Sequence, residues 1–309
     1  MKIINSLSEL SLDNSVVALG TFDGLHLGHK SIVEKALELA QAKACPAVVF
    51  SFSSHPLELL NPELAPSLLL TYEEKAKALR HMGVDILVSI RFDKELAEIS
   101  AQEFANILCS KACPQAIVVG ENFTYGKKGR GNPELLLEEC TARGIELQIL
   151  PLLHVDNLQA SSSRIRQLIM QGDIQTANHL LGRLYCLSGQ VVQGSQIGRT
   201  IGFPTANINL AATRLAIPAV GGYIVSVKYQ DRIYKGIANI GFNPTVGSLK
   251  EKRLEVHLLD FQGDLYGQEL SVCFHKYLCA EQKFANLDEL KAHIARQKVL
   301  AEAYFADRN

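Results

Sequence analysis

The chain of 309 residues lacks any apolar stretch long enough to span a membrane, and its formal net charge is only −1. The first absence predicts that the protein has no membrane partner. The second argues against nucleic acid or an anionic membrane surface as the main partner. The N-terminal residues form no basic-then-apolar leader, so we expect a cytoplasmic globular protein.

Cysteine is present without a regular spacing. The chain has seven cysteines, an odd number, and the only close pair is Cys109 and Cys113. No further cysteine or histidine near this pair would complete a zinc site. We therefore expect reduced, mostly buried thiols and no disulfide.

Two regions with different hydrophobic periods predict two domains, which the chain length also favours. Short apolar runs alternate with helical patterns as far as residue 150, with strands expected at 16–19, 47–52, 85–90, 116–119 and 146–150. Buried strands separated by helices are typical of an α/β doubly wound parallel sheet. Such sheets bind ligands beyond the carboxyl ends of their strands.

The chain beyond residue 182 reads as strands joined by turns. Residues 223–229 and 232–238 flank Gln230-Asp231, which is typical of a β-hairpin. Hairpins without crossover helices predict a small antiparallel β-barrel, and an amphipathic pattern between Leu287 and Tyr304 predicts a C-terminal helix. We place the domain boundary so that the domains comprise residues 1–183 and 184–309.

Residues 20–29 read Gly-Thr-Phe-Asp-Gly-Leu-His-Leu-Gly-His and join the first strand to a helical pattern. A strand that leads through a turn into a helix N-terminus offers unpaired N–H groups and the positive end of the helix dipole, so it favours the binding of phosphate. His26 and His29 lie on one side of that helix and would donate to phosphate oxygens of ATP. Ordinary helix-capping histidines are the alternative. The other residues expected at these phosphates are Gly20, Phe22, Asp23, Gly24 and Gly28.

The segment 161–166, Ser-Ser-Ser-Arg-Ile-Arg, is a second candidate phosphate site. Hydroxyls at a helix start beside arginines supply fixed donors for a triphosphate. We therefore expect Ser162, Ser163 and Arg166 at the phosphates of the first domain. The alternative is a helix cap followed by surface arginines.

A glycine-rich stretch opens the second domain and ends in Pro204-Thr205-Ala206-Asn207. It is not a P-loop, because three residues separate two of its glycines and arginine replaces the lysine. Thr205 and Asn207 offer two hard oxygens for Mg²⁺, although a plain turn would also explain them. Glycine lets the backbone approach phosphates closely. The phosphate contacts expected here are Gly189, Gly194, Gly198, Arg199 and Gly202.

The chain resembles bacterial bifunctional riboflavin kinase/FMN adenylyltransferases over nearly its whole length. The resemblance rests on the form of residues 20–29, on the segments 51–56 and 119–126, and on the PTAN tetrapeptide. The resemblance implies a multifunctional transferase that makes FMN from riboflavin and FAD from FMN, with release of pyrophosphate in the second step. ATP is then the co-substrate of both steps, with Mg²⁺. The expected partners are these small molecules, and no oligomeric state is indicated.

The resemblance also implies roles for single residues. His26, His29 and Arg166 would stabilise charge during adenylyl transfer, and Glu255 would be the base of the kinase, although a solvent-facing glutamate is the alternative. Asn239 and Asn243 are interpreted as turn formers. The residues expected near the flavin or nucleotide of the first domain are His55, Pro56, Asn122 and Phe123.

Three positions depart from the family pattern. Cys279 stands where arginine is usual, Gln297 where aspartate is common, and Gly221 where valine is usual. The loss of the arginine bears on ligand binding in the kinase domain. Two alternatives to the bifunctional enzyme therefore stay open. One is a single-activity FMN adenylyltransferase with a flavin-binding barrel, and the other is a non-catalytic flavin-binding protein.

Overall fold

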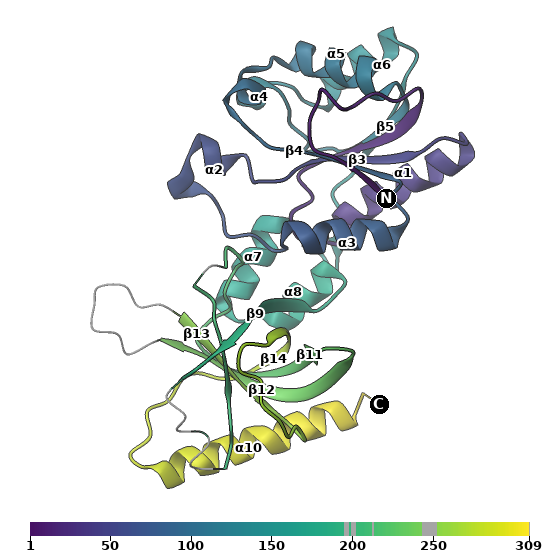
Figure 1. The fold of residues 1–309 in the computed structure, drawn as a ribbon. Helices are drawn as coiled ribbons and strands as arrows, with labels where there is room; N and C mark the ends of the chain where they lie inside the picture. The colour runs from purple at the N-terminus through teal and green to yellow at the C-terminus, as the bar shows by residue number, and fades with distance from the viewer. Residues whose placement is uncertain (195–197, 199–201, 212, 243–251, 309) are drawn as a thin grey trace. The chain divides into compact units, whose positions relative to one another are not determined.

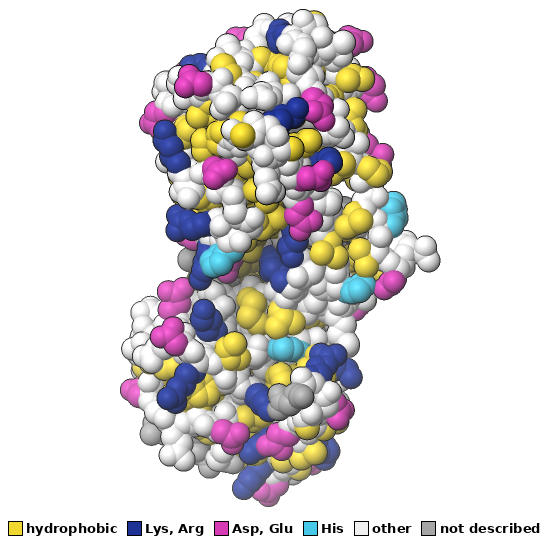
Figure 2. Space-filling model, turned by 90° about the vertical axis from the view of Figure 1, so that its right-hand side faces the viewer, with side chains coloured by type: hydrophobic (Ala, Val, Ile, Leu, Met, Phe, Trp, Pro, Cys, Tyr) yellow, Lys and Arg dark blue, Asp and Glu magenta, His cyan; other side chains and the backbone are white. Residues whose placement is uncertain are grey.

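The computed structural model describes residues 1–194, 198, 202–211, 213–242 and 252–308. The chain divides into two compact units, Met1–Ser162 and Ser163–Asn309 (Figure 1). No helix within the described ranges is long and apolar enough to cross a membrane. Figure 2 shows positive and negative side chains interspersed on the face in view, in agreement with the small net charge.

The first unit is built on a six-stranded parallel sheet, as the alternating pattern predicts. The strand order is β1-β4-β3-β2-β5-β6, and every neighbouring pair is parallel. The short first strand was not predicted, because three residues carry too little periodicity. The strands are β1 (Lys2–Ile4), β2 (Ser15–Leu19), β3 (Ala47–Phe52), β4 (Ile86–Ile90), β5 (Pro114–Gly120) and β6 (Glu146–Leu150).

Helices cover both faces of this sheet (Figure 1). Val17 of β2 packs in a cluster with Leu108 of α5 (Ala101–Ala112), whereas Val16 packs in another cluster with Val33 of α1 (Leu27–Ala42). Because successive strand residues point to opposite faces, both must be apolar here. The helices are α1 (Leu27–Ala42), α2 (Leu57–Leu60), α3 (Tyr72–Met82), α4 (Lys94–Glu98), α5 (Ala101–Ala112) and α6 (Pro133–Ala142), with 3-10 turns η1 (Asp23–Leu25), η2 (Pro62–Leu64) and η3 (Lys127–Gly129) and a small hairpin β7 (His154–Val155) and β8 (Leu158–Gln159).

The second unit contains a closed antiparallel barrel of order β10-β13-β12-β11-β14-β9, which confirms the predicted barrel. A C-terminal helix, α10 (Leu287–Ala306), packs Ala301 and Ile294 against Ile224 and Ile237 of the barrel. The strands are β9 (Tyr185–Val192), β10 (Ala206–Ile208), β11 (Gly221–Tyr229), β12 (Arg232–Phe242), β13 (Lys252–Leu258) and β14 (Glu269–Cys279).

Two further helices, α7 (Ser162–Gln171) and α8 (Ile174–Leu181), precede the barrel. Asn178 of α8 donates to the carbonyl of Phe274 on β14 at 2.8 Å and accepts from the amide of Tyr185 on β9 at 2.7 Å. Leu180 and Leu181 are fully buried. These contacts place α8 in the same compact unit as the barrel, whereas the boundary expected from the sequence follows residue 183.

The structure corrects the expectation that all cysteines are reduced. Cys186 and Cys273 form a disulfide. They lie directly opposite each other on β9 and β14, with Cα atoms 4.0 Å apart. The two residues are 87 positions apart in the chain, so strand register brings them together and spacing in the sequence gives no sign of it. The other cysteines are free thiols.

Candidate active sites

The turn between β2 and α1 carries the first candidate site. Phe22 has a left-handed backbone, with φ of 50°, and Gly24 has φ of 79°. A Cβ at Gly24 would lie 2.9 Å from the Leu69 side chain, so the turn leaves room only for glycine there. Residues held in such sparsely populated conformations cluster at binding sites. The turn therefore presents the start of α1 in a fixed position.

His26 and His29 lie stacked at the N-terminus of α1, with ring centroids 3.7 Å apart. Nδ1 of His26 accepts a hydrogen bond from the backbone amide of His29 at 3.3 Å, so His26 does cap the helix. An accepting Nδ1 leaves the proton of a neutral imidazole on Nε2. The capping contact therefore also sets up Nε2 of His26 as a donor.

Both histidines are neutral near pH 7. Burial lowers the pKa of His26 to about 4. Burial also lowers the pKa of His29 well below 6.5, and repulsion from the charge of Lys75 and from the protonated form of His26 adds to this shift. Nδ1 of His29 is buried and has no hydrogen-bond partner within the described structure. A buried ring nitrogen without a partner is a free position for a ligand atom.

Ser162 is held at the same turn, because its hydroxyl donates to the carbonyl of Asp23 at 2.9 Å. The Asp23 carboxylate itself accepts from the amide of Leu69 at 2.9 Å. Ser163 and Arg166 follow on α7, in the second compact unit, where they line an open hollow on one face of the helix. That Ser163 and Arg166 act on the same phosphates as the histidines stays a prediction.

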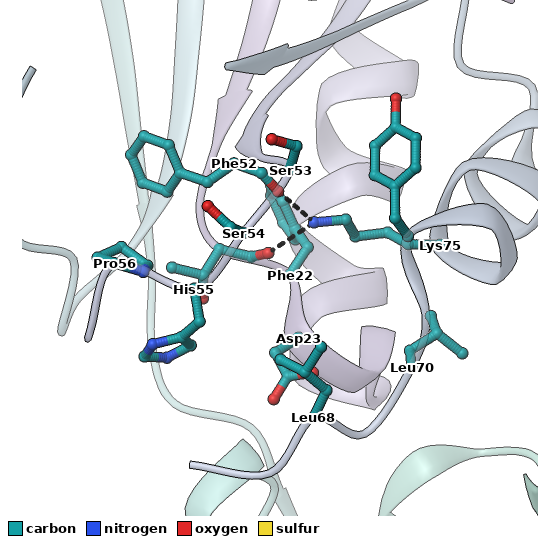
Figure 3. Close-up of a pocket in the computed structure, with 12 residues that line it drawn as sticks. Phe22, Asp23, Phe52, Ser53, Ser54, His55, Pro56, Leu68, Leu70 and Lys75 are labelled. Atoms are coloured by element: carbon teal, nitrogen blue, oxygen red, sulfur yellow. Dashed lines mark hydrogen bonds between the residues drawn. The ribbon is translucent and has the colours of Figure 1, made fainter. Parts of the chain in front are cut away.

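A pocket opens beside Asp23 at the carboxyl ends of β2 and β3 (Figure 3). It contains about 410 Å³ of atom-free space that opens to solvent. His55 and Pro56, both predicted at a ligand, line it. Asn122 and Phe123 do not line it, and the Phe123 ring instead stacks on Tyr125 with centroids 5.6 Å apart. The lining residues are Thr21, Phe22, Asp23, Phe52, Ser53, Ser54, His55, Pro56, Leu68, Leu70, Tyr72 and Lys75.

Lys75 is a pocket residue that sequence reasoning missed. It is buried on α3, beside the buried residues Ala76 and Leu79. A lysine on the apolar face of a helix was the available signal, since lysine is almost never fully buried without a partner.

The second candidate site lies on the barrel. Glu255 of β13 is directly opposite Asn207 of β10 on one side and Asn239 of β12 on the other. Opposite residues of antiparallel strands share a face, so these three side chains form a row. Asn239 lies within a strand, so its interpretation as a turn former is wrong. Glu255 also pairs with Arg253 at 3.3 Å.

Three of the glycines expected at the phosphates are closely packed, and Gly194 lies against this row. A Cβ at Gly194 would overlap the Asn207 side chain, and one at Gly198 would overlap the carbonyl of Phe203. A Cβ at Gly189 would lie 2.6 Å from the carbonyl of Asn209, and Gly202 has φ of 85°. The predicted contact Arg199 and the predicted turn former Asn243 lie outside the described residues.

The positions that depart from the family pattern lie together. The Gln297 side-chain amide is 3.0 Å from Sγ of Cys279 and 3.0 Å from Nε2 of His293. The arginine and aspartate of the expected family pattern would carry opposite charges, so a loss of both at this contact would leave neither charge unpaired. Gly221 has φ of 142°, and a Cβ there would overlap the carbonyl of Cys279 and lie 2.7 Å from the Tyr277 ring. Glycine therefore fits this packing.

Comparison with known proteins assigns a family to each part of the chain. A family model described as FAD synthetase matches residues 8–164, and one described as Riboflavin kinase matches residues 181–305. A bifunctional riboflavin kinase/FMN adenylyltransferase of Escherichia coli K12 is 36% identical over 304 residues, covering 98% of this chain and 96% of the relative. One from Bacillus subtilis 168 is 33% identical over 296 residues, covering 95% and 93%.

A solved structure with the same fold is that of a protein from Streptococcus pneumoniae, which is named a macrolide-efflux protein. It has a TM-score of 0.89 and 32% identity, and covers 97% of this chain and 98% of its own. That name applies to the Streptococcus pneumoniae protein alone, whereas both domain models and the curated relatives name flavin enzymes. The chain therefore belongs to the bifunctional riboflavin kinase/FMN adenylyltransferase family.

Proposed function

We propose that this chain makes FAD in two steps, with FMN adenylylation assigned to residues 1–183 and riboflavin phosphorylation to residues 184–309. The main support for this proposal is that the chain contains both domains, each with its own candidate site. The presence of the Asn207–Glu255 row favours the bifunctional enzyme over a barrel that only binds flavin. The small net charge supports small molecules rather than nucleic acid as partners. We place the reaction in the cytoplasm, where ATP is supplied.

In adenylyl transfer, an oxygen of the FMN phosphate attacks the α-phosphorus of ATP and pyrophosphate leaves. Burial favours the neutral imidazoles of His26 and His29, so we assign both the role of hydrogen-bond donors to the phosphates. The N-terminus of α1 adds its dipole, and Ser163 and Arg166 add donors and charge. Ser162 holds the turn at the phosphates through its hydrogen bond to Asp23. Fixed donors of this kind stabilise charge as it moves to the leaving group.

The flavin of FMN would lie beside the pocket at the end of β3. His55 and Pro56 line this pocket, together with the rings of Phe52 and Tyr72. Aromatic and apolar walls suit a planar ring system. Asn122 and Phe123 would contact the ligand from the loop after β5.

In the kinase, the ribityl 5′-hydroxyl attacks the γ-phosphorus of ATP. Glu255 accepts the proton of that hydroxyl. Thr205 and Asn207 are suited to hold Mg²⁺, because a hydroxyl and an amide oxygen are hard donors. The ion supplies charge neutralisation at the phosphates. Within the described residues no cluster of three His, Cys, Asp or Glu residues forms another metal site. The phosphates would be contacted by Gly189, Gly194, Gly198, Arg199 and Gly202.

Incubation of the purified protein with riboflavin, ATP and Mg²⁺, followed by chromatography of the flavins, tests this function. Both FMN and FAD should appear. FAD made from added FMN, without FMN made from riboflavin, would establish the single-activity adenylyltransferase. Neither product would establish a binding protein.

A further inference from the structure

The pocket in the first unit contains a buried cation to which the proposed mechanism gives no role. Lys75 is 8% exposed. Its Nζ donates to the carbonyl oxygens of Phe52 at 2.8 Å and Thr21 at 3.3 Å (Figure 3) and to Oγ of Ser51 at 3.1 Å. All three acceptors are uncharged, and burial of a charge without an ionic partner is unfavourable.

The position of Lys75 on α3 is also unfavourable for a cation. It lies near the N-terminus of the helix, where the dipole favours negative charge. The helix start is already stabilised by a reciprocal capping pair between Thr71 and Glu74. Burial lowers the pKa of Lys75 to about 8, and the negative charge of Asp23 opposes the shift. Helix stability therefore does not account for this lysine, and such a perturbed group in a pocket points to function.

The hydrogen bonds of Lys75 join the ends of two strands. Thr21 follows β2, whereas Ser51 and Phe52 end β3, and Ser51 donates in turn to the carbonyl of Thr21 at 2.9 Å. An ammonium has three N–H donors, and all three are engaged here. Lys75 therefore has no donor left for direct contact with a substrate.

The charge of Lys75 nevertheless acts on the phosphate-binding turn. It is one of the causes that lower the pKa of His29. Because His26 and His29 are neutral, the stacked pair supplies no positive charge of its own. A phosphate at this turn would therefore meet the field of the lysine.

We propose that Lys75 is a positioning residue of the adenylyltransferase site, where it locks the ends of β2 and β3 together and holds a fixed positive charge for a bound phosphate group. This inference rests on the proposed adenylyltransferase function. The phosphate belongs either to FMN or to ATP. Lys75 acts on it through Thr21, Ser51 and Phe52 and through its charge.

The first test compares three variants of the full chain in FAD formation from added FMN. Lys75→Met removes the charge and keeps most of the stem, Lys77→Met removes an exposed charge from the same helix, and Ser51→Ala removes one acceptor but keeps the lysine. We expect Lys75→Met to lower kcat/KM by about 10- to 100-fold, less than the 10²–10³ typical of a directly donating group. Lys77→Met should match the wild type, and riboflavin phosphorylation should be unchanged in all three.

Separate titrations of the two substrates identify the phosphate. A larger rise of KM for FMN in Lys75→Met assigns the phosphate to FMN, and a larger rise for ATP assigns it to ATP. A wild-type value of kcat/KM in Lys75→Met would overturn the proposal.

A pH profile separates the charge from a purely structural role. FAD formation by the wild type should fall as pH rises through about 8, because the ammonium loses its proton. Asp23, His29, His55 and Tyr72 are the other titratable groups around the pocket. Ser51→Ala should therefore keep the fall, and Lys75→Met should lose it. A fall that persists in Lys75→Met, or its absence from the wild type, would refute the role of the charge.

Two controls keep the outcomes distinct. If Lys75→Met does not fold, the wild-type pH profile and the charge-conserving Lys75→Arg variant test the role of the charge instead. We expect Lys75→Arg to keep part of the wild-type rate of FAD formation. If the wild type makes no FAD from FMN, the proposed adenylyltransferase function fails and this inference fails with it. A wild type that makes FAD, with a lysine variant that makes it equally well, refutes only the role of Lys75.

Discussion

Replacement of Glu255 by glutamine separates the two proposed activities in a single protein. Glutamine keeps the shape of the side chain but removes the carboxylate that would accept the proton of the 5′-hydroxyl. Loss of a general base commonly lowers the rate by about 10² to 10⁴. At 1.36 kcal/mol per tenfold, this corresponds to a rise of roughly 3–5 kcal/mol in the activation barrier. Riboflavin phosphorylation should therefore nearly vanish.

The structure indicates that this loss would not come from unfolding. The only ion pair of Glu255 within the described residues is with Arg253, at 3.3 Å, and the two side chains are 20% and 30% exposed. A partly exposed pair contributes about 0–1 kcal/mol to stability. Since a typical domain is stable by about 5–15 kcal/mol, the variant should remain folded.

The assay gives each variant either riboflavin or FMN, with ATP and Mg²⁺, and quantifies the flavins by chromatography. Glu255→Gln supplied with FMN should make FAD at the wild-type rate, and Glu269→Gln, which changes an exposed carboxylate of the same barrel, should retain both reactions. Near-normal FMN production by Glu255→Gln would refute its role as the base. The base would then have to be sought elsewhere on the barrel.

Three further outcomes are expected from the geometry of the two units. His29→Ala should slow FAD formation from FMN and leave riboflavin phosphorylation intact, because the residue acts at the adenylyl site; an equal loss of both activities in folded protein would contradict this assignment. The free energy of unfolding, measured with urea, should fall as pH falls from about 6.5 to about 4, because burial holds the pKa of His26 at about 4 and the unfolded chain takes up the proton first; an equally steep fall in His26→Gln would argue against this cause. A fragment of residues 184–309 should fold and phosphorylate riboflavin without making FAD, and a fragment of residues 163–309 should do the same with greater stability to urea, because it keeps the contacts of α8 with β14 and β9; equal stability of the two fragments would count against that packing.

The sequence alone determined the fold class, because both hydrophobic periods follow directly from secondary structure. Runs such as Val16–Leu19 are apolar on both faces, which is typical of a parallel strand covered by helices on both sides. Residues 223–229 and 232–238 around Gln230-Asp231 likewise predicted an antiparallel hairpin. The glycine-rich turn and the histidine pair also stood out, since both lie within ten consecutive residues.

Tertiary structure decided the features that depend on residues far apart in the chain. Cys186 meets Cys273 only through the register of β9 and β14, and Glu255 meets Asn207 and Asn239 only because β13 lies between β10 and β12. The lowered pKa values of His26 and Lys75 also depend on tertiary structure. Burial sets the charge of an ionisable group, and burial depends on every element packed around that group.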